Sequence, residues 1–221
     1  MDLIKRWNYL HTWMMLIAGL LSLVFWGLQT MQLAIILSFI FFIYLHWYWL
    51  KTLKPFGGYA NWISLFRWIL ILVGGIILEQ GQEIWGFPFF LIALCMDGLD
   101  GYLARKYNQT SDFGAYLDME TDAYFVALLS MFWYLDGRVG GWILFIGFLR
   151  YLYVLALKVF RLEGKKEKGT RFAKTIAVLI MSALLAPFVL PEIIFLPALM
   201  ITSILTIYSF GLSFLSRLQN N

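Results

Sequence analysis

The chain has 221 residues, of which 62% are hydrophobic and 14% are charged, with a net charge of +4 and a mean hydropathy of +0.77. This composition excludes an ordinary soluble domain and is typical of a helical protein that crosses a membrane several times. The apolar runs are continuous rather than alternating, which argues against an outer-membrane barrel.

Eight apolar segments follow one another along the chain, and we interpret each as a transmembrane helix. They span residues 10–29, 31–50, 63–78, 85–103, 114–135, 141–159, 172–190 and 193–215. Pro55, Gly57 and Gly58 mark a break after the second segment. We therefore expect an all-α, polytopic membrane bundle with an N-terminal two-helix hairpin over residues 1–58 and a six-helix core over residues 59–221.

Basic residues gather on one side of this predicted bundle. The loops on that side hold Lys5, Arg6, Lys51, Lys54, Arg105, Lys106, Arg161, Lys165, Lys166, Lys168, Arg171, Lys174 and Arg217. The other side has Arg138 as its single basic residue. The positive-inside rule then predicts both termini in the cytoplasm, in a cell (inner) membrane. No A-x-A-like site follows Leu28, so we expect the first helix to be retained.

Four aspartates lie inside or at the end of apolar segments: Asp97, Asp100, Asp118 and Asp122. Spacings of i,i+3 and i,i+4 place each pair on one helix face. Uncompensated, four buried aspartates would cost on the order of 10 kcal/mol on insertion scales. Two divalent cations would neutralise them, and paired cations suit phosphoryl chemistry. Glu120 falls on a different face, where we expect either a packing role or a solvated position.

Small and basic residues surround these aspartates. Gly98, Gly101 and Ala104 would let another backbone or a ligand approach closely, and Gly114 leaves space one turn before Asp118. Arg105 follows at a predicted helix end, where a guanidinium can bind a phosphate through two hydrogen bonds. His11 and His46 flank aromatic clusters and are predicted to lie at the membrane interface rather than to act as ligands.

The stretch from Asp97 to Asp122 matches D-x2-D-G-x2-A-R-x8-G-x3-D-x3-D at every specified position. It thereby resembles the signature of the CDP-alcohol phosphotransferases, also called CDP-alcohol phosphatidyltransferases. The resemblance implies two Mg²⁺ or Mn²⁺ ions per active site, bound by this aspartate cluster, in which Asp122 is also the general base. It further implies contact with the CDP donor by Gly101, Ala104, Arg105 and Gly114.

A second stretch, residues 61–67, resembles the family's N-x2-[ST]-x2-R pattern through Asn61, Ser64 and Arg67. These three residues share a helix face by i,i+3 spacing, and the resemblance implies that they contact the CDP group. The alternative is an N-capped helix with an arginine that reaches out to the membrane surface, which is a common arrangement.

Arg150 lies near the middle of an apolar helix, where an unpaired arginine is costly. The resemblance suggests that it contacts a phosphate or another polar group of the acceptor, and we add Lys158 and Lys174 as candidate acceptor residues. The alternative for Arg150 is a structural ion pair with a buried carboxylate. Tyr151 departs from the Arg-Glu pair of the phosphatidylglycerophosphate synthase branch, which argues against that branch.

The resemblance implies a membrane enzyme that transfers a phosphatidyl group from CDP-diacylglycerol to a hydroxyl acceptor and releases CMP. The acceptor would be, for example, a phosphorylated polyol. The resemblance also implies that the enzyme is a homodimer. Transfer of a phospho-alcohol from a soluble CDP-alcohol to diacylglycerol would use the same motif and stays open. A cation-binding transporter is a third alternative, although neither a pair of interrupted helices nor a repeat is evident in the sequence. A membrane scaffold is the fourth, and no nucleic-acid partner is expected.

Overall fold

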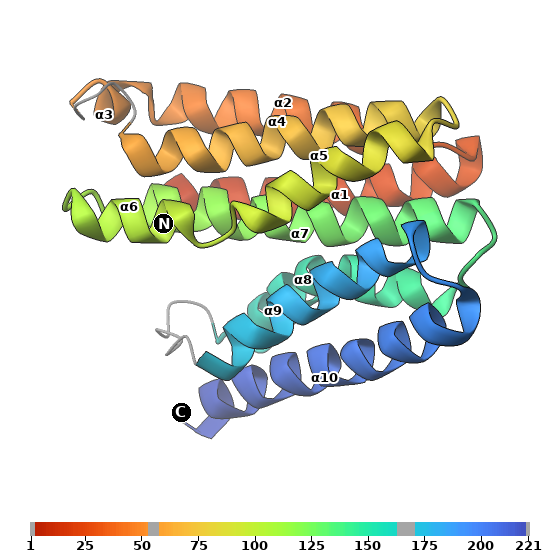
Figure 1. The fold of residues 1–221 in the computed structure, drawn as a ribbon. Helices are drawn as coiled ribbons and strands as arrows, with labels where there is room; N and C mark the ends of the chain where they lie inside the picture. The colour runs from red at the N-terminus through yellow and green to blue at the C-terminus, as the bar shows by residue number, and fades with distance from the viewer. Residues whose placement is uncertain (1–2, 53–57, 163–170, 220–221) are drawn as a thin grey trace.

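The computed structural model describes residues 3–52, 58–162 and 171–219, and within these ranges the chain is helical and contains no strand (Figure 1). The α-helices are α1 Leu3–Phe25, α2 Gln29–Leu45, α3 Trp47–Leu50, α4 Tyr59–Glu79, α5 Glu83–Cys95, α6 Leu99–Lys106, α7 Asp112–Leu135, α8 Trp142–Val159, α9 Arg171–Leu185 and α10 Glu192–Gln219. A 3₁₀ turn, η1 Ala186–Phe188, follows α9 directly and precedes the connection to α10. The predicted all-α fold is confirmed.

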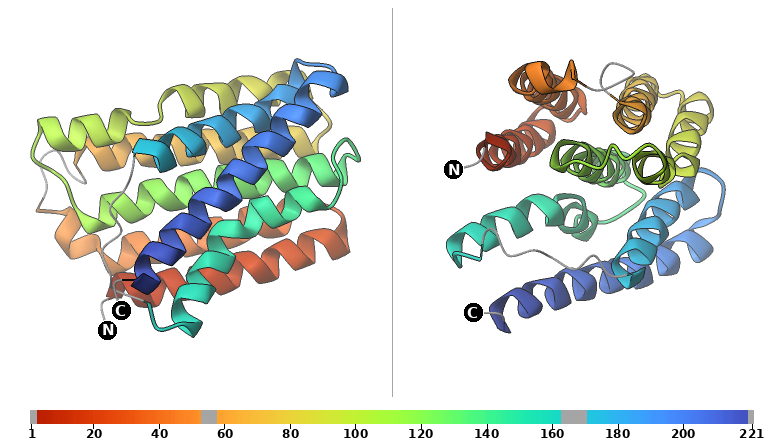
Figure 2. Two further views of the ribbon diagram at one scale, coloured as in Figure 1. Left: turned by 90° about the horizontal axis from the view of Figure 1, so that it is seen from below. Right: turned by 90° about the vertical axis from the view of Figure 1, so that its left-hand side faces the viewer.

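Helix α7 lies in the middle of the bundle, with the other long helices arranged around it (Figure 2, right). Its second half is buried on all sides because nearly every residue there is apolar, including Leu128 and Trp133. Glycines allow the neighbouring helices to come close. A Cβ atom on Gly75 of α4 would lie 2.8 Å from Leu128, and one on Gly147 of α8 would lie 2.7 Å from Ser130.

Among the described residues, four helices are long and apolar enough to cross a membrane: α1, α4, α8 and α10. Helices α2 and α5 and the segment Phe172–Phe188 are apolar but shorter. Helix α7 has 24 residues, but its first half carries the aspartates and Glu120. The structure therefore supports an integral membrane bundle, whereas the total of eight spans and the six-helix core stay predictions.

The helix predicted over residues 85–103 is interrupted at the aspartate motif, which corrects the sequence-based expectation. Helix α5 ends at Cys95 and α6 begins at Leu99. Gly98 between them has φ +80° and ψ −12°, a left-handed conformation that L-residues rarely adopt. Asp97 consequently lies in the turn before α6 rather than on a helix face that it shares with Asp100.

Two other predicted helices also end early or break. The segment 31–50 is divided at His46 into α2 and α3, and the segment 172–190 closes with η1, which contains Pro187. The break predicted at Pro55 and Gly57 lies outside the described residues, so the division at residue 58 stays a prediction.

The hairpin formed by α1 and α2 packs against α4, α7 and α8 and shares one apolar core with them. Trp7 of α1 stacks on Phe42 of α2, with ring centroids 3.9 Å apart. At the turn between the two helices, the backbone amide of Leu28 donates a hydrogen bond to Glu79 Oε1 at 2.9 Å. The turn of the hairpin is thus hydrogen-bonded to the end of α4, and the hairpin helices also pack against the core.

The two ends of the bundle differ in charge. Both termini lie at the end that also holds α3 and the tip of α6 (Figure 1). At the opposite end, Arg138 is paired with Glu83 at 2.6 Å and with Asp136 at 2.8 Å. The single basic residue predicted on that side is therefore neutralised locally, which agrees with the charge asymmetry behind the predicted orientation.

Candidate active site

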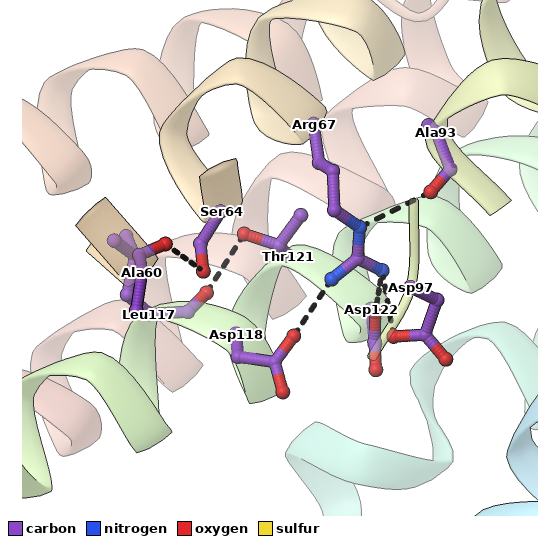
Figure 3. A network of polar contacts seen from close by, with 9 residues as sticks. All are labelled: Ala60, Ser64, Arg67, Ala93, Asp97, Leu117, Asp118, Thr121 and Asp122. Atoms are coloured by element: carbon purple, nitrogen blue, oxygen red, sulfur yellow. Dashed lines mark hydrogen bonds and ion pairs between the residues drawn. The ribbon is translucent and has the colours of Figure 1, made fainter. Parts of the chain in front are cut away.

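Arg67 lies at the centre of a cluster of aspartates (Figure 3). Its Nη1 is 2.7 Å from Asp118 Oδ1, and its Nη2 is 2.6 Å from Asp122 Oδ1 and 3.1 Å from Asp97 Oδ1. The Arg67 Nε donates a hydrogen bond to the carbonyl oxygen of Ala93 at 3.1 Å. One guanidinium therefore joins α4, the end of α5, the turn before α6, and α7.

The local sequence explains how these groups come together. Asp118 and Asp122 are one turn apart on α7, whose N-terminus is capped by Ser111, since its side chain accepts a hydrogen bond from the amide of Gly114. A Cβ on Gly114 would lie 2.7 Å from Asn61 Oδ1, so glycine at this position lets α7 lie close to the Asn61 side chain of α4. Gly98 turns the chain so that Asp97 faces the same cluster.

The cluster has the donors that a hard divalent cation prefers. One carboxylate oxygen from each of Asp97, Asp118 and Asp122 lies within 4.8 Å of the other two. Three negative charges against the single charge of Arg67 leave an excess of two, which a divalent cation would balance. The residues therefore fit such an ion. Asp100 belongs to α6, but its side chain is outside the described part of the structure.

Asn61, Ser64 and Arg67 are all buried on one face of α4, as the i,i+3 spacing predicted. The alternative of a capped helix with an arginine at the membrane surface is wrong. Helix α4 begins at Tyr59 with Gly58 as its N-cap, and Arg67 is only 1% exposed. Ser64 Oγ donates a hydrogen bond to the carbonyl of Ala60 at 3.4 Å.

The residues of α6 that the motif assigns to the donor are more open. Gly101 and Ala104 are partly buried, and Arg105 is exposed near the C-terminal end of the helix. A Cβ on Gly101 would lie 3.4 Å from Nη1 of Arg105, so the guanidinium reaches back over the glycine. This arrangement places a cationic group beside Gly101 on α6, whose tip lies at the same end of the bundle as the termini.

A cavity of about 250 Å³ opens between α7, α8, α9 and α10. Its walls are mostly apolar, and they include Gly147, Ala177 and Ile180. Two charged residues also line it, Asp122 and Arg150. Asp122 therefore belongs both to the cluster around Arg67 and to the wall of this cavity.

Arg150 pairs with Glu120, whose Oε1 lies 2.7 Å from Arg150 Nη2. The ion pair with a buried carboxylate is present, and Arg150 lines the cavity as well. Glu120 is 1% exposed, so the solvated position considered for it is wrong and the packing role is confirmed. Its second oxygen lies 3.4 Å from Nε2 of His11.

His11 is the residue of this region whose contacts the sequence did not reveal. The interfacial position predicted for it is wrong, because its side chain is completely buried between the hairpin and the core. The sequence showed only a single histidine within an apolar segment, and this pattern does not identify Glu120 as its partner.

The two candidate acceptor lysines, Lys158 and Lys174, are exposed and do not line the cavity. Lys158 Nζ lies 4.3 Å from the centre of the Tyr9 ring.

Comparison with known proteins matches residues 58–212 to the family model named CDP-alcohol phosphatidyltransferase. An uncharacterised protein of Aquifex aeolicus is 35% identical over 37% of this chain and 45% of its own length. A probable CDP-diacylglycerol–inositol 3-phosphatidyltransferase of Arabidopsis thaliana is 33% identical over 35% of this chain and 34% of its own. A CDP-diacylglycerol–glycerol-3-phosphate 3-phosphatidyltransferase of Haemophilus influenzae is 42% identical over 27% of this chain and 34% of its own length. The chain thus spans less than half the length of these relatives, and no solved structure matches it.

Proposed function

The chain belongs to the CDP-alcohol phosphatidyltransferase family, and from this premise we propose that it transfers a phosphatidyl group from CDP-diacylglycerol to a hydroxyl acceptor and releases CMP. The observation that carries the proposal is the position of Asp122, which joins the carboxylate cluster to a cavity large enough for a small acceptor. The names of the relatives point to acceptors such as inositol or glycerol 3-phosphate, and we propose a polyol or a polyol phosphate here.

We assign the divalent ion, Mg²⁺ or Mn²⁺, to Asp97, Asp118 and Asp122, and the matched motif adds Asp100 as a further ligand. We propose two such ions per active site. A divalent cation bound there would stabilise negative charge on the pyrophosphate and on the transferred group.

Asp122 is the proposed general base. It takes the proton from the acceptor hydroxyl, and the hydroxyl oxygen then attacks the phosphorus that carries the lipid. A new P–O bond forms, the pyrophosphate P–O bond breaks, and CMP leaves with the bonding electrons. Arg67 supports this role because its Nη2 contact of 2.6 Å fixes one oxygen of Asp122 at the cluster.

The donor and the acceptor are proposed to approach Asp122 from opposite sides. For the CDP group we assign the face of α4 and the small residues of α6 and α7: Asn61, Ser64, Arg67, Gly101, Ala104, Arg105 and Gly114. For the acceptor we assign Arg150, because it lines the cavity and its Nε has no hydrogen-bond partner among the described residues. Lys158 and Lys174 stay predictions for the acceptor.

The apolar walls of the cavity support a second candidate. They suit the chains of diacylglycerol, whose free hydroxyl would then be the acceptor and attack the phosphorus of a soluble CDP-alcohol. Family membership argues against a transporter or a scaffold, since this family consists of phosphatidyltransferases. The homodimer and the cytoplasmic orientation of the site also remain our proposals.

An acceptor screen with purified full-length protein tests the assignment. CDP-diacylglycerol labelled in its acyl chains is incubated with Mg²⁺ and single acceptors, including inositol, glycerol 3-phosphate and other polyol phosphates. We expect one acceptor to give both a labelled phospholipid and CMP. Labelled diacylglycerol with soluble CDP-alcohols is the parallel assay for the second candidate. Absence of CMP release in every combination would refute both.

A further inference from the structure

We propose that the N-terminal hairpin supplies a positioning residue for the reaction: His11 acts through Glu120 to hold Arg150 at the wall of the acceptor cavity. The hairpin helices α1 and α2 lie before residue 58, where the family match begins. This inference rests on the proposed function, in which Arg150 contacts the acceptor. It gives the hairpin a task in specificity, in addition to its packing against the core.

The geometry forms a chain of three charged or polar groups from three helices. Nε2 of His11 on α1 lies 3.4 Å from Glu120 Oε2, an electrostatic contact without a hydrogen bond, and Oε1 of Glu120 on α7 accepts a hydrogen bond from Arg150 Nη2 at 2.7 Å. The two oxygens of Glu120 therefore face different partners. His11 and Glu120 are completely buried, whereas the side chain of Arg150 is 14% exposed where it meets the cavity.

The hairpin holds the imidazole of His11 from several sides. Nδ1 of His11 lies 2.8 Å from the hydroxyl of Ser38 on α2, so the two nitrogens of the ring face Ser38 and Glu120. The ring of Trp7 stacks against the imidazole with centroids 4.9 Å apart, and Trp7 Nε1 donates a hydrogen bond to the carbonyl of Ser38 at 3.0 Å. Both hairpin helices thus fix the direction of Nε2.

The consequence for Arg150 follows from the cost of a buried carboxylate. A buried ionised group needs its full set of partners, and a carboxylate that loses one of them reorients or draws its remaining partner toward itself. Arg150 is that remaining partner of Glu120. Its Nε donor, which lacks a partner among the described residues, would then move relative to the cavity wall.

Helix α7 connects the two regions because it carries both sets of residues on different faces. Asp118 and Asp122 point to the cluster around Arg67, and Glu120 points to the hairpin. A change at His11 should therefore reach the acceptor through α7 and α8 without touching the groups assigned to the CDP donor. This separation gives the proposal a signature that loss of packing alone does not produce.

Three substitutions at His11 separate the contacts of the ring. His11→Phe keeps an aromatic ring against Trp7 but removes both nitrogens. His11→Asn retains a group that can reach Ser38 and loses the contact with Glu120. His11→Gln extends an amide toward Glu120 in place of Nε2. We expect Phe and Asn to raise the acceptor KM about tenfold and Gln to stay within about threefold of wild type.

The measurements use purified full-length protein with the acceptor identified by the screen, and they give KM for the acceptor and for CDP-diacylglycerol separately. The donor KM should stay within about twofold of wild type. Ser22→Ala is the matched control, because Ser22 is a buried polar residue of α1 whose hydroxyl lies 2.6 Å from that of Thr30, inside the hairpin. It should leave both constants unchanged.

A double-mutant cycle shows whether the effect passes through Arg150. In an Arg150→Gln background, His11→Asn should cause no further increase in the acceptor KM. If His11→Phe does not yield folded protein, His11→Asn carries the test. Additive effects, equal increases for donor and acceptor, or an effect no larger than that of Ser22→Ala would overturn the proposal. Absence of turnover in the wild type would refute the proposed function and this inference together, whereas turnover with unchanged His11 variants would refute the inference alone.

Discussion

Nη2 of Arg67 lies 2.6 Å from Oδ1 of Asp122, so the buried arginine of α4 directly contacts the carboxylate that lines the cavity of α7–α10. The same guanidinium contacts Asp97 and Asp118. Asp122 therefore has two surroundings, a charged one on the side of the cluster and a largely apolar one on the side of the cavity. A proton acceptor between a donor site and an acceptor site requires this kind of position.

Asp122→Asn should lower turnover by roughly 10²–10⁴, the usual contribution of a positioned base, while the affinity for the CDP donor stays nearly unchanged. Asparagine keeps the volume of the side chain, and Arg67 retains its contacts with Asp97 and Asp118. The measurement is donor affinity and turnover of the same purified variant across a series of Mg²⁺ concentrations.

Asp112→Asn is the control for this substitution, because Asp112 is an exposed aspartate in the first turn of the same helix. It should reduce turnover by less than about twofold, since it only weakens a favourable interaction with the helix N-terminus. Restoration of the Asp122 variant by high Mg²⁺ would show that Asp122 acts as a metal ligand alone and would remove its proposed role as the base.

Activity should disappear in excess chelator and return with Mg²⁺ or Mn²⁺, because the acidic cluster carries more negative charge than Arg67 balances. Asp97→Asn and Asp118→Asn should each raise the Mg²⁺ concentration for half-maximal activity by about tenfold or more. Binding of Mn²⁺ to the purified variants, followed by electron paramagnetic resonance, checks the same effect without turnover. Full activity in excess EDTA would contradict a metal site.

The motif and the helical segments could be read from the sequence because both depend on local patterns. Continuous apolar runs predicted the long helices, and the i,i+3 spacing predicted the buried face of Asn61, Ser64 and Arg67. The interruption at Gly98 could not be read in this way. Apolar residues recur on both sides of it, and the left-handed conformation of one glycine becomes visible only in the structure.

The partners of the buried charges could not be predicted from the sequence either, since each pair joins helices that are distant along the chain. Arg67 and Asp122 are 55 residues apart, and Arg150 and Glu120 are 30 apart. Spacing along one helix identifies a shared face, but it does not say which other helix covers that face. His11 was misread for this reason, because only the docking of the hairpin brings it to Glu120.

The predicted orientation can be tested with single cysteines in a Cys95→Ala background, which removes the exposed natural cysteine. Thr110→Cys lies in the exposed loop between α6 and α7, and Gln82→Cys lies in the exposed turn between α4 and α5. In intact cells, an impermeant maleimide should label the Gln82 variant and spare the Thr110 variant. The reverse pattern would place the aspartate cluster toward the outside.

Filling the cavity should impair use of the acceptor more than binding of the donor. Ala177→Trp places a large ring on the cavity wall of α9, and we expect the acceptor KM to rise at least tenfold while the affinity for CDP-diacylglycerol changes less than about threefold. The physical reason is volume, because a tryptophan side chain occupies a large part of a cavity of about 250 Å³.

Val178→Trp is the matched control, since Val178 is the next residue along α9 and its side chain is exposed on the outer surface of the bundle. It adds the same ring to the same helix and should leave both constants near their wild-type values. If the Ala177 variant weakens donor binding and spares the acceptor, the cavity holds the lipid part of CDP-diacylglycerol. If both variants behave alike, the cavity takes no part in the reaction, and Asp122 must meet its acceptor from another direction.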